Sequence, residues 1–191
     1  MVSDDVVEAY ARDGVVVVRG LITAAELEQI AAGMGKALAN RSSAAVVTGD
    51  DTGVTFEDVC RWAEIDELGK VALRSGASRT AAELMDSPTA RFYFDHILIK
   101  EPTANQVAEW HQDVPFFNVL GRGISAWIPV DRVPKVGSPE FWAGSHLGPW
   151  RLPRSFLERE AKWFPEGTLA EVPDIDADRS LYDIRRWELD P

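Results

Sequence analysis

Apolar residues in the N-terminal part of the chain recur at the spacing of an α-helix. Thr23 and Glu26 have the spacing of a capping box. The apolar positions that follow are three or four residues apart: Leu27, Ile30, Met34 and Leu38. This spacing predicts an amphipathic helix that begins after Thr23. A shorter helix is predicted over residues 4–11, before Gly14, and the β-branched run VVVV at 15–18 predicts a strand.

Loop-forming and helix-forming stretches alternate up to the middle of the chain. Ser, Thr, Gly and Asp are frequent over 41–53, which predicts a loop. Two further helices are predicted around 57–74 and 78–85, and the Ser-Pro pair at 87–88 ends this part. Residues 1–88 are therefore expected to be mostly helical.

The remainder of the chain is richer in aromatic and β-branched residues. Three stretches are typical of strands: RFYFDHILIK at 91–100, ISAWIPVD at 124–131 and LYDIRRWEL at 181–189. One more helix is predicted at 154–164. Because repeats, low-complexity tracts and linkers are absent from the sequence, residues 1–191 are expected to form one domain whose part 89–191 is β-rich.

Composition and charge narrow the classes of partner. A hydrophobic content of 46%, with seven Trp and eight Phe, is sufficient for a globular core. The net charge is −11, from 31 acidic and 20 basic side chains, and no block of lysine and arginine interrupts it. Such a chain repels a phosphate backbone, so we expect a small-molecule substrate and not a nucleic acid.

Cysteine usage and the N-terminus bear on the compartment. The single cysteine, Cys60, cannot form an intramolecular disulfide, which favours a reducing cytoplasm but also fits a secreted protein without disulfides. The N-terminus lacks a basic segment followed by an apolar one, and the VVVV run is far too short to span a bilayer. We therefore expect a cytoplasmic protein with neither a signal peptide nor a membrane segment.

The stretch AEWHQDVPFF at 108–117 contains a histidine and an aspartate two residues apart. On a strand, side chains at this spacing project to the same face, so His111 and Asp113 could bind one metal ion together. Imidazole with carboxylate suits Fe(II), and zinc would tolerate the same ligands. A lone His-x-Asp triplet arises often by chance, but here Trp110, Phe116 and Phe117 could keep water from the site.

The triplet belongs to a series of four motifs between Phe94 and His146: DHILIKEP, WHQD, AWIPVD and GSPEFWAGSH. In this order and spacing, and together with the opening YARDGVVVVRGLITAAELEQI, the chain resembles the phytanoyl-CoA dioxygenase family of Fe(II)/2-oxoglutarate-dependent oxygenases. The resemblance implies an α+β protein, mainly β with flanking helices. Its core would be a double-stranded β-helix, also called a jelly roll or cupin-like barrel.

Roles for five residues follow from the resemblance. His111 and Asp113 would be iron ligands, and Lys100, Gln112 and Trp127 would lie near the co-substrate 2-oxoglutarate. An ammonium can neutralise a carboxylate of that dianion, although a solvated lysine at a strand end is an equal alternative for Lys100. Gln112 would point away from the metal on an ideal strand, so it needs a bend to contribute, and Trp127 could equally be a core residue.

The third ligand of the family is a distal histidine, and neither remaining histidine matches it. His96 is expected to be packed or hydrogen-bonded, and His146 closes a turn motif. In the family the distal histidine and an arginine follow a stretch like WELDP, with which this chain ends at Pro191. The resemblance therefore implies an incomplete ligand set and missing C-terminal strands. A truncated chain, a subunit completed by a second chain and a degenerate homologue remain open explanations.

The reaction implied by the resemblance is oxidation of a small metabolite or natural-product intermediate, coupled to decarboxylation of 2-oxoglutarate to succinate. Hydroxylation is favoured over halogenation, because related halogenases lack the carboxylate ligand that Asp113 provides. Two alternatives remain. One is a non-catalytic or partner-dependent subunit of a split oxygenase, and the other is a cupin-type metal-binding protein that does not use 2-oxoglutarate.

Overall fold

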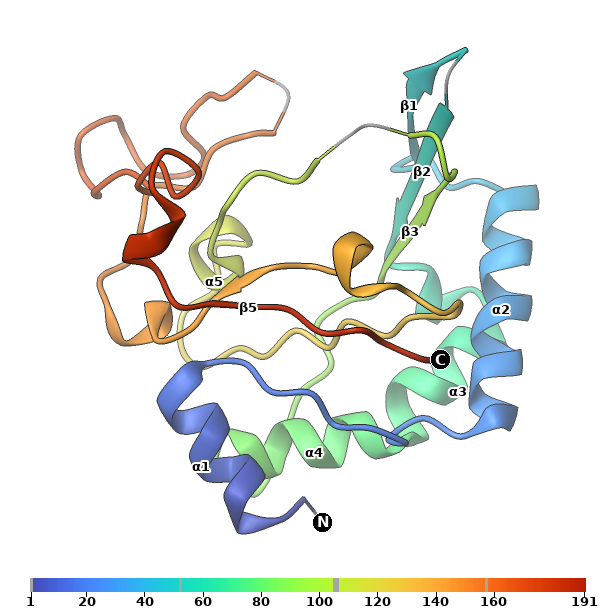
Figure 1. Ribbon diagram of the computed structural model, residues 1–191. Helices are drawn as coiled ribbons and strands as arrows, with labels where there is room; N and C mark the ends of the chain where they lie inside the picture. Colours follow the sequence, from blue (N-terminus) through green and yellow to red (C-terminus); the bar gives the residue numbers. More distant parts are fainter. Residues whose placement is uncertain (1, 52, 105–106, 157) are drawn as a thin grey trace. The chain divides into compact units, whose positions relative to one another are not determined.

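The computed structural model describes residues 2–51, 53–104, 107–156 and 158–191, shown in Figure 1. The chain divides into two compact units, which are described separately. The helix–sheet unit comprises Arg19–Ala82, Ser87–Val107 and Pro191, and the loop-rich unit comprises Met1–Val18, Glu83–Asp86 and Ala108–Asp190.

The longest helix of the helix–sheet unit is α2, Ala24–Ala39, and it begins as its sequence predicts. The Thr23 hydroxyl accepts a hydrogen bond from the Glu26 backbone N–H, and the Glu26 carboxylate accepts one from the Thr23 N–H. These two bonds satisfy donors that would otherwise be unpaired at the helix start. The predicted capping box is therefore confirmed.

The sheet of this unit has three antiparallel strands in the order β1, β2, β3. Their bounds are Val46–Asp50, Gly53–Val59 and His96–Lys100. Phe56 of the central strand pairs with Val47 on one side and Ile99 on the other. The predicted strand at 91–100 is confirmed over its second half.

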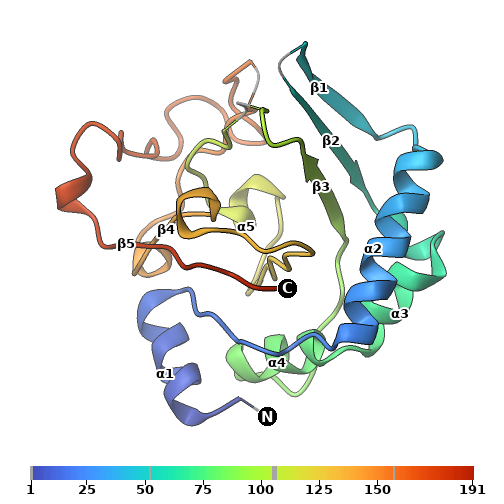
Figure 2. The same ribbon diagram turned by 45° about the vertical axis from the view of Figure 1, so that its right-hand side comes forward.

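The core of the unit lies where α2, the sheet and α3 (Asp66–Arg74) meet. Figure 2 shows α2 and α3 side by side, and their approach depends on Gly33, where an added Cβ would lie 2.6 Å from Leu68 Cγ. The buried apolar cluster is Ala37, Phe56, Ile65, Leu68 and Ile97. The helix α4, Gly76–Leu84, follows as predicted and continues into the second unit.

Two predictions for this region are wrong. Residues 46–50 of the expected loop form β1, and residues 57–59 of the expected helix belong to β2. β1 and β2 pair as a hairpin, and β2 is also held by hydrogen bonds to β3, which is distant in sequence and gives no signal in the neighbouring residues. The second part of the expected 57–74 helix is present as α3.

A buried ion pair lies at the end of β2. Asp58 is fully buried, and its Oδ2 accepts a hydrogen bond from Arg61 Nη1 at 2.6 Å. The carboxylate also accepts bonds from the Ser42 N–H, the Ser42 hydroxyl and the Val59 N–H. Burial raises the pKa of Asp58, but these hydrogen bonds outweigh it and hold the pKa below its usual value. The pair therefore joins the start of the β1 hairpin to β2.

The loop-rich unit begins with α1, Asp4–Asp13, which ends at Gly14 as predicted. Gly14 has φ of 73°, and its N–H donates to the Tyr10 carbonyl. The following VVVV is not a strand, because no described residue pairs with it in a ladder. The unit also contains the short helix α5, Asp113–Phe116.

Regular strands are short in this unit. β4, Phe141–Trp142, pairs antiparallel with β5, Ile184–Arg185, and Val133 forms an isolated bridge with Leu189. The predicted strand at 181–189 is therefore present only in part, and the one at 124–131 is absent from the described ladders. The predicted helix at 154–164 is also wrong for its described residues, Leu157 lying outside them.

The described residues of 154–164 form an irregular loop that ion pairs and a backbone bridge stabilise. Arg154 forms ion pairs with Glu166 at 2.8 Å and Glu171 at 2.6 Å, and its backbone forms a bridge with Ala161. These contacts outweigh the helical propensity of RSFLEREAKWF.

The two units contain helices and small antiparallel sheets, so the α+β character is present. The jelly roll, the missing strands and the single domain with its 1–88 and 89–191 parts stay predictions. No helix among the described residues has both the length and the apolar character needed to cross a bilayer.

Candidate metal site

His111 and Asp113 face each other at the start of α5. His111 lies in an irregular segment, and Asp113 is the first residue of the helix. Gln112 between them is extended, with φ −111° and ψ 129°, so its two neighbours project to the same side. His111 Nε2 lies 3.3 Å from Asp113 Oδ1. One extended residue thus produces the arrangement that we expected from a whole strand.

The other imidazole nitrogen of His111 is held by the backbone. Nδ1 lies 2.6 Å from the carbonyl oxygen of Glu109, to which an Nδ1–H donates. Histidines that bind metals commonly donate their second N–H in this way, which leaves Nε2 as the ligand atom. Burial lowers the pKa of His111, but the interactions with Asp113 and the Glu109 carbonyl raise it above its ordinary value. Metal binding at Nε2 would therefore displace a proton at low pH.

A serine distant in sequence orients the Asp113 carboxylate. The Ser125 hydroxyl donates to Asp113 Oδ2, while Oδ1 is the oxygen beside His111. Sequence reasoning missed Ser125, because a single serine in ISAWIPVD gives no signal of its own. Its role is positional: it fixes the carboxylate so that one oxygen is directed toward the imidazole.

Aromatic side chains surround the imidazole. The ring centroid of His111 lies 5.4 Å from Phe116 and 5.0 Å from Phe156, and the two phenyl rings stack at 4.9 Å. Phe117 contacts Phe116 edge to face at 5.3 Å. Phe116 and Phe117 were expected to keep water from the site. Phe156 was not expected there, because it lies in the segment 154–164 that was predicted to be a helix.

The three residues expected near 2-oxoglutarate lie in different units and have different surroundings. Gln112 points away from the His111 and Asp113 pair, since its Oε1 accepts from the Arg151 N–H at 2.8 Å. Trp127 belongs to the same unit and is 46% exposed, which excludes a fully buried core role. Lys100 belongs to the helix–sheet unit, where it ends β3 and pairs with Thr55. Their contact with a co-substrate stays a prediction.

The other two histidines are engaged elsewhere. His96 Nε2 lies 3.0 Å from Glu57 Oε2, and His146 Nε2 lies 3.1 Å from the carbonyl oxygen of Ala11. Both are hydrogen-bonded, as expected for His96. Within the part of the chain that the structure describes, no group of three or more His, Cys, Asp or Glu side chains could hold a metal ion.

The donor set of His111 and Asp113 fits two adjacent positions around a metal ion. Two ligand atoms that each lie about 2.1 Å from a metal, at roughly a right angle, are about 3.0 Å apart. The observed separation of 3.3 Å requires only a small adjustment to reach this value. The Nδ1 contact with the Glu109 carbonyl and the Ser125 contact with Oδ2 already hold both ligands from behind.

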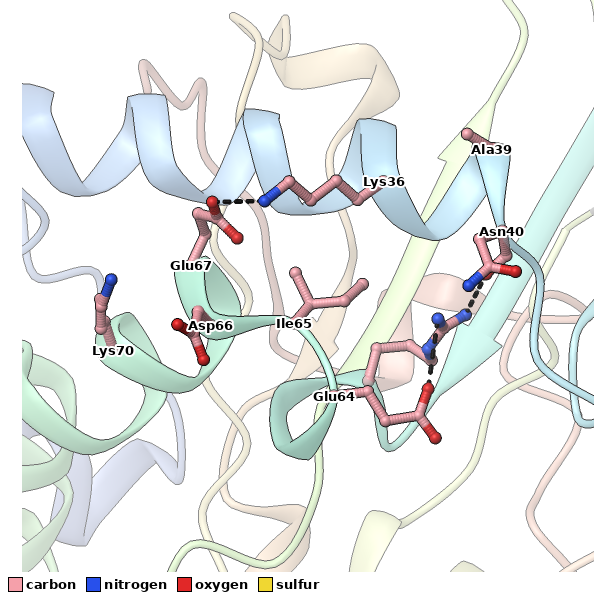
Figure 3. Close-up of a pocket in the computed structure, with 9 residues that line it drawn as sticks. Lys36, Ala39, Asn40, Glu64, Ile65, Asp66, Glu67 and Lys70 are labelled. Atoms are coloured by element: carbon pink, nitrogen blue, oxygen red, sulfur yellow. Dashed lines mark hydrogen bonds and ion pairs between the residues drawn. The ribbon is translucent and has the colours of Figure 1, made fainter.

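A pocket in the helix–sheet unit is a poorer candidate for a metal site. Figure 3 shows it between the end of α2 and the start of α3. Its charged lining consists of Lys36, Arg61, Lys70, Glu64, Asp66 and Glu67. The three positive and three negative charges balance, Lys36 pairs with Glu67 at 2.6 Å, and the lining contains neither histidine nor cysteine.

The sequence profile of the phytanoyl-CoA dioxygenase family, PhyH, matches residues 10–187. The chain belongs to the phytanoyl-CoA dioxygenase family. The match includes His111, Asp113 and Ser125, so the candidate site lies inside the family region. The expected family membership is confirmed. A comparison with curated protein sequences gives no significant match.

Two solved structures share the fold of this family member. The crystal structure of the non-heme alpha ketoglutarate dependent epimerase SnoN from nogalamycin biosynthesis has a TM-score of 0.62 at 20% identity, over 98% of this chain and 69% of that chain. The structure of SnoN in complex with Fe3+, alpha ketoglutarate and nogalamycin RO gives 0.64 at 20% identity, over 98% and 70%. At this identity the likeness shows a common fold.

Proposed function

We propose that this chain carries the metal-binding part of an Fe(II)- and 2-oxoglutarate-dependent oxygenase that oxidises a small organic molecule. The observation that carries the proposal is the His111 and Asp113 pair, whose ligand atoms lie 3.3 Å apart within the PhyH match. The complex of the structurally similar SnoN contains Fe3+ and alpha ketoglutarate, which supports the same cofactors here.

Each residue of the site has a defined task in this proposal. His111 Nε2 and Asp113 Oδ1 would hold the iron, which, when bound with 2-oxoglutarate and oxygen, supplies the oxidising power. The Glu109 carbonyl keeps the proton of His111 on Nδ1, and Ser125 keeps the carboxylate turned toward the imidazole. Phe116 and Phe156 cover one side of the imidazole and limit the access of water.

The proposal also covers the type of oxidation and the class of substrate. Asp113 provides a carboxylate where a halogenase needs an open position for chloride, so we propose hydroxylation or another oxidation of a C–H bond. The structurally similar SnoN is an alpha ketoglutarate dependent epimerase, so this fold also carries a reaction other than hydroxylation. The substrate proposed is a small metabolite or natural-product intermediate.

A second candidate is a chain that binds metal but needs a partner to react. It is favoured by the presence of only two gathered donors among the described residues. Lys100, Gln112 and Trp127 keep their proposed co-substrate role in the first candidate only. Consumption of 2-oxoglutarate by the isolated chain separates the two.

The test measures Fe(II) binding under anaerobic conditions by calorimetry, and succinate formation from 2-oxoglutarate in air. We expect His111→Ala to weaken Fe(II) binding by at least about tenfold and to abolish any succinate formation. His96→Ala is the matched control, because His96 pairs with Glu57 in the other unit and should leave both readouts unchanged. Equal Fe(II) affinity of wild type and His111→Ala would refute the metal assignment.

A further inference from the structure

A lysine from a distant loop lies beside the candidate metal site. Lys162 Nζ is 3.7 Å from the centroid of the Phe116 ring and 5.6 Å from that of Trp163. Phe116 in turn contacts the imidazole of His111. The ring of Phe116 therefore contacts both the ammonium of Lys162 and the imidazole of His111 within the loop-rich unit.

The loop around Lys162 is held by backbone and side-chain hydrogen bonds. The Lys162 N–H donates to the Pro153 carbonyl at 2.8 Å, and the Trp163 indole N–H donates to the Phe116 carbonyl at 2.9 Å. Lys162 is half-buried, and these two hydrogen bonds hold the backbone of Lys162 and the side chain of the next residue. Its ammonium is thus presented by an ordered loop.

Lys162 differs from its basic neighbours in its partners. Arg154 pairs with Glu166 and Glu171, and Arg159 pairs with Glu109 at 2.6 Å. Among the residues outside the gaps at 1, 52, 105–106 and 157, no carboxylate forms an ion pair with Lys162. In a chain with 31 acidic and 20 basic side chains, Lys162 is a half-buried lysine whose ammonium faces aromatic rings instead of a carboxylate.

The energetics favour an anion at this position. Burial lowers the pKa of Lys162, because removing the ammonium from water disfavours its charged form. Contact with an aromatic face stabilises a cation only in part, so an incoming carboxylate would gain a strong charge-assisted hydrogen bond. The stacked pair of Phe116 and Phe156 offers an apolar surface next to the same ammonium.

We propose that Lys162 recognises the primary substrate by binding its carboxylate, while Phe116 and Phe156 contact an apolar, preferably aromatic, body. The inference rests on the proposed function, because it takes His111 and Asp113 as the reacting centre. It narrows the substrate class to organic acids with an apolar body. Lys162 would act as a specificity residue that places such a molecule beside the metal.

Benzoate is a suitable probe, and benzamide is its neutral counterpart. Binding of both to the full chain is measured by ligand-observed NMR, without metal and with Fe(II) and 2-oxoglutarate under anaerobic conditions. We expect wild type to prefer benzoate, and Lys162→Gln to weaken benzoate binding by about tenfold with no effect on benzamide. Lys162→Arg should retain the preference, and Lys135→Gln, an exposed lysine in the same unit, should bind as wild type.

The outcomes separate three explanations. Unchanged benzoate affinity in a folded Lys162→Gln protein would overturn the proposal and leave the lysine with a structural role on Phe116. Weaker 2-oxoglutarate binding with unchanged benzoate binding would assign Lys162 to the co-substrate and also overturn it. Benzoate binding that depends on Lys162 in a chain without Fe(II) binding would support the anion site and refute the oxygenase function. Unfolding midpoints confirm that each variant is folded.

Discussion

Replacement of Asp58 by asparagine tests whether the buried ion pair of the helix–sheet unit stabilises the fold. The Asp58 carboxylate accepts four hydrogen bonds and is fully buried. An asparagine keeps one oxygen and places an NH2 group where the other oxygen was. That NH2 group would face donors, either Arg61 Nη1 with the Ser42 N–H, or the Ser42 hydroxyl with the Val59 N–H.

The expected cost follows from these contacts. Asp58→Asn loses acceptor capacity for two donors and removes the buried counter-charge of the Arg61 guanidinium, whose side chain is 3% exposed. Removing one partner of a buried ion pair costs about 3–5 kcal/mol, so we expect the free energy of unfolding to fall by about 4 kcal/mol. Arg61 retains its bond to the Asn40 carbonyl and its contact with Glu64, which keeps the loss near the middle of that range.

The assay is urea unfolding followed by circular dichroism, with the slope of the transition checked for constancy. Glu28→Gln on the exposed face of α2 is the control and should change stability by less than about 0.5 kcal/mol. A loss below about 1 kcal/mol for Asp58→Asn would refute the reasoning, because it would mean that the pair contributes no more than a surface ion pair.

The same pair predicts a pH dependence with a definite sign. The folded-state pKa of Asp58 is depressed, so its contribution is complete above the unfolded pKa of about 3.9 and is lost as the pH falls through the folded value. The stability difference between wild type and Asp58→Asn should therefore be constant near neutrality and shrink below about pH 4. A difference that grew with acidification would contradict the assignment.

Two further predictions concern the loop-rich unit. Gly14→Ala should lower the free energy of unfolding by more than about 1–2 kcal/mol, because φ is 73° and the new Cβ would lie 2.3 Å from His146 Nδ1. The loss should be smaller in a His146→Ala background, where that contact is removed. An equal loss in both backgrounds would exclude the contact as a cause. Ser125→Ala should weaken Fe(II) binding by about tenfold with little change in unfolding midpoint, since the hydroxyl holds the candidate carboxylate ligand, and unchanged affinity by calorimetry would show that it does not.

The helices that were predicted correctly carry their signals in neighbouring residues. The α2 helix has its capping box and its apolar face within one stretch, and Gly14 ends α1 with a conformation that glycine adopts readily. The strand β2 has no comparable signal, because GVTFEDV becomes a strand through pairing with β1 and β3. Its pairing partners in β3 lie more than thirty residues away, as Val59 and His96 illustrate.

The same distinction applies inside the candidate site. His111 and Asp113 could be predicted as a pair even though the expected strand is absent, because a single extended residue between them is enough to align their side chains. Ser125 comes from one loop, and Phe156 and Lys162 come from another, so no spacing around His111 and Asp113 predicts them. We expect the side chains from these loops to govern substrate choice, which makes Lys162 a sharper test of specificity than either ligand.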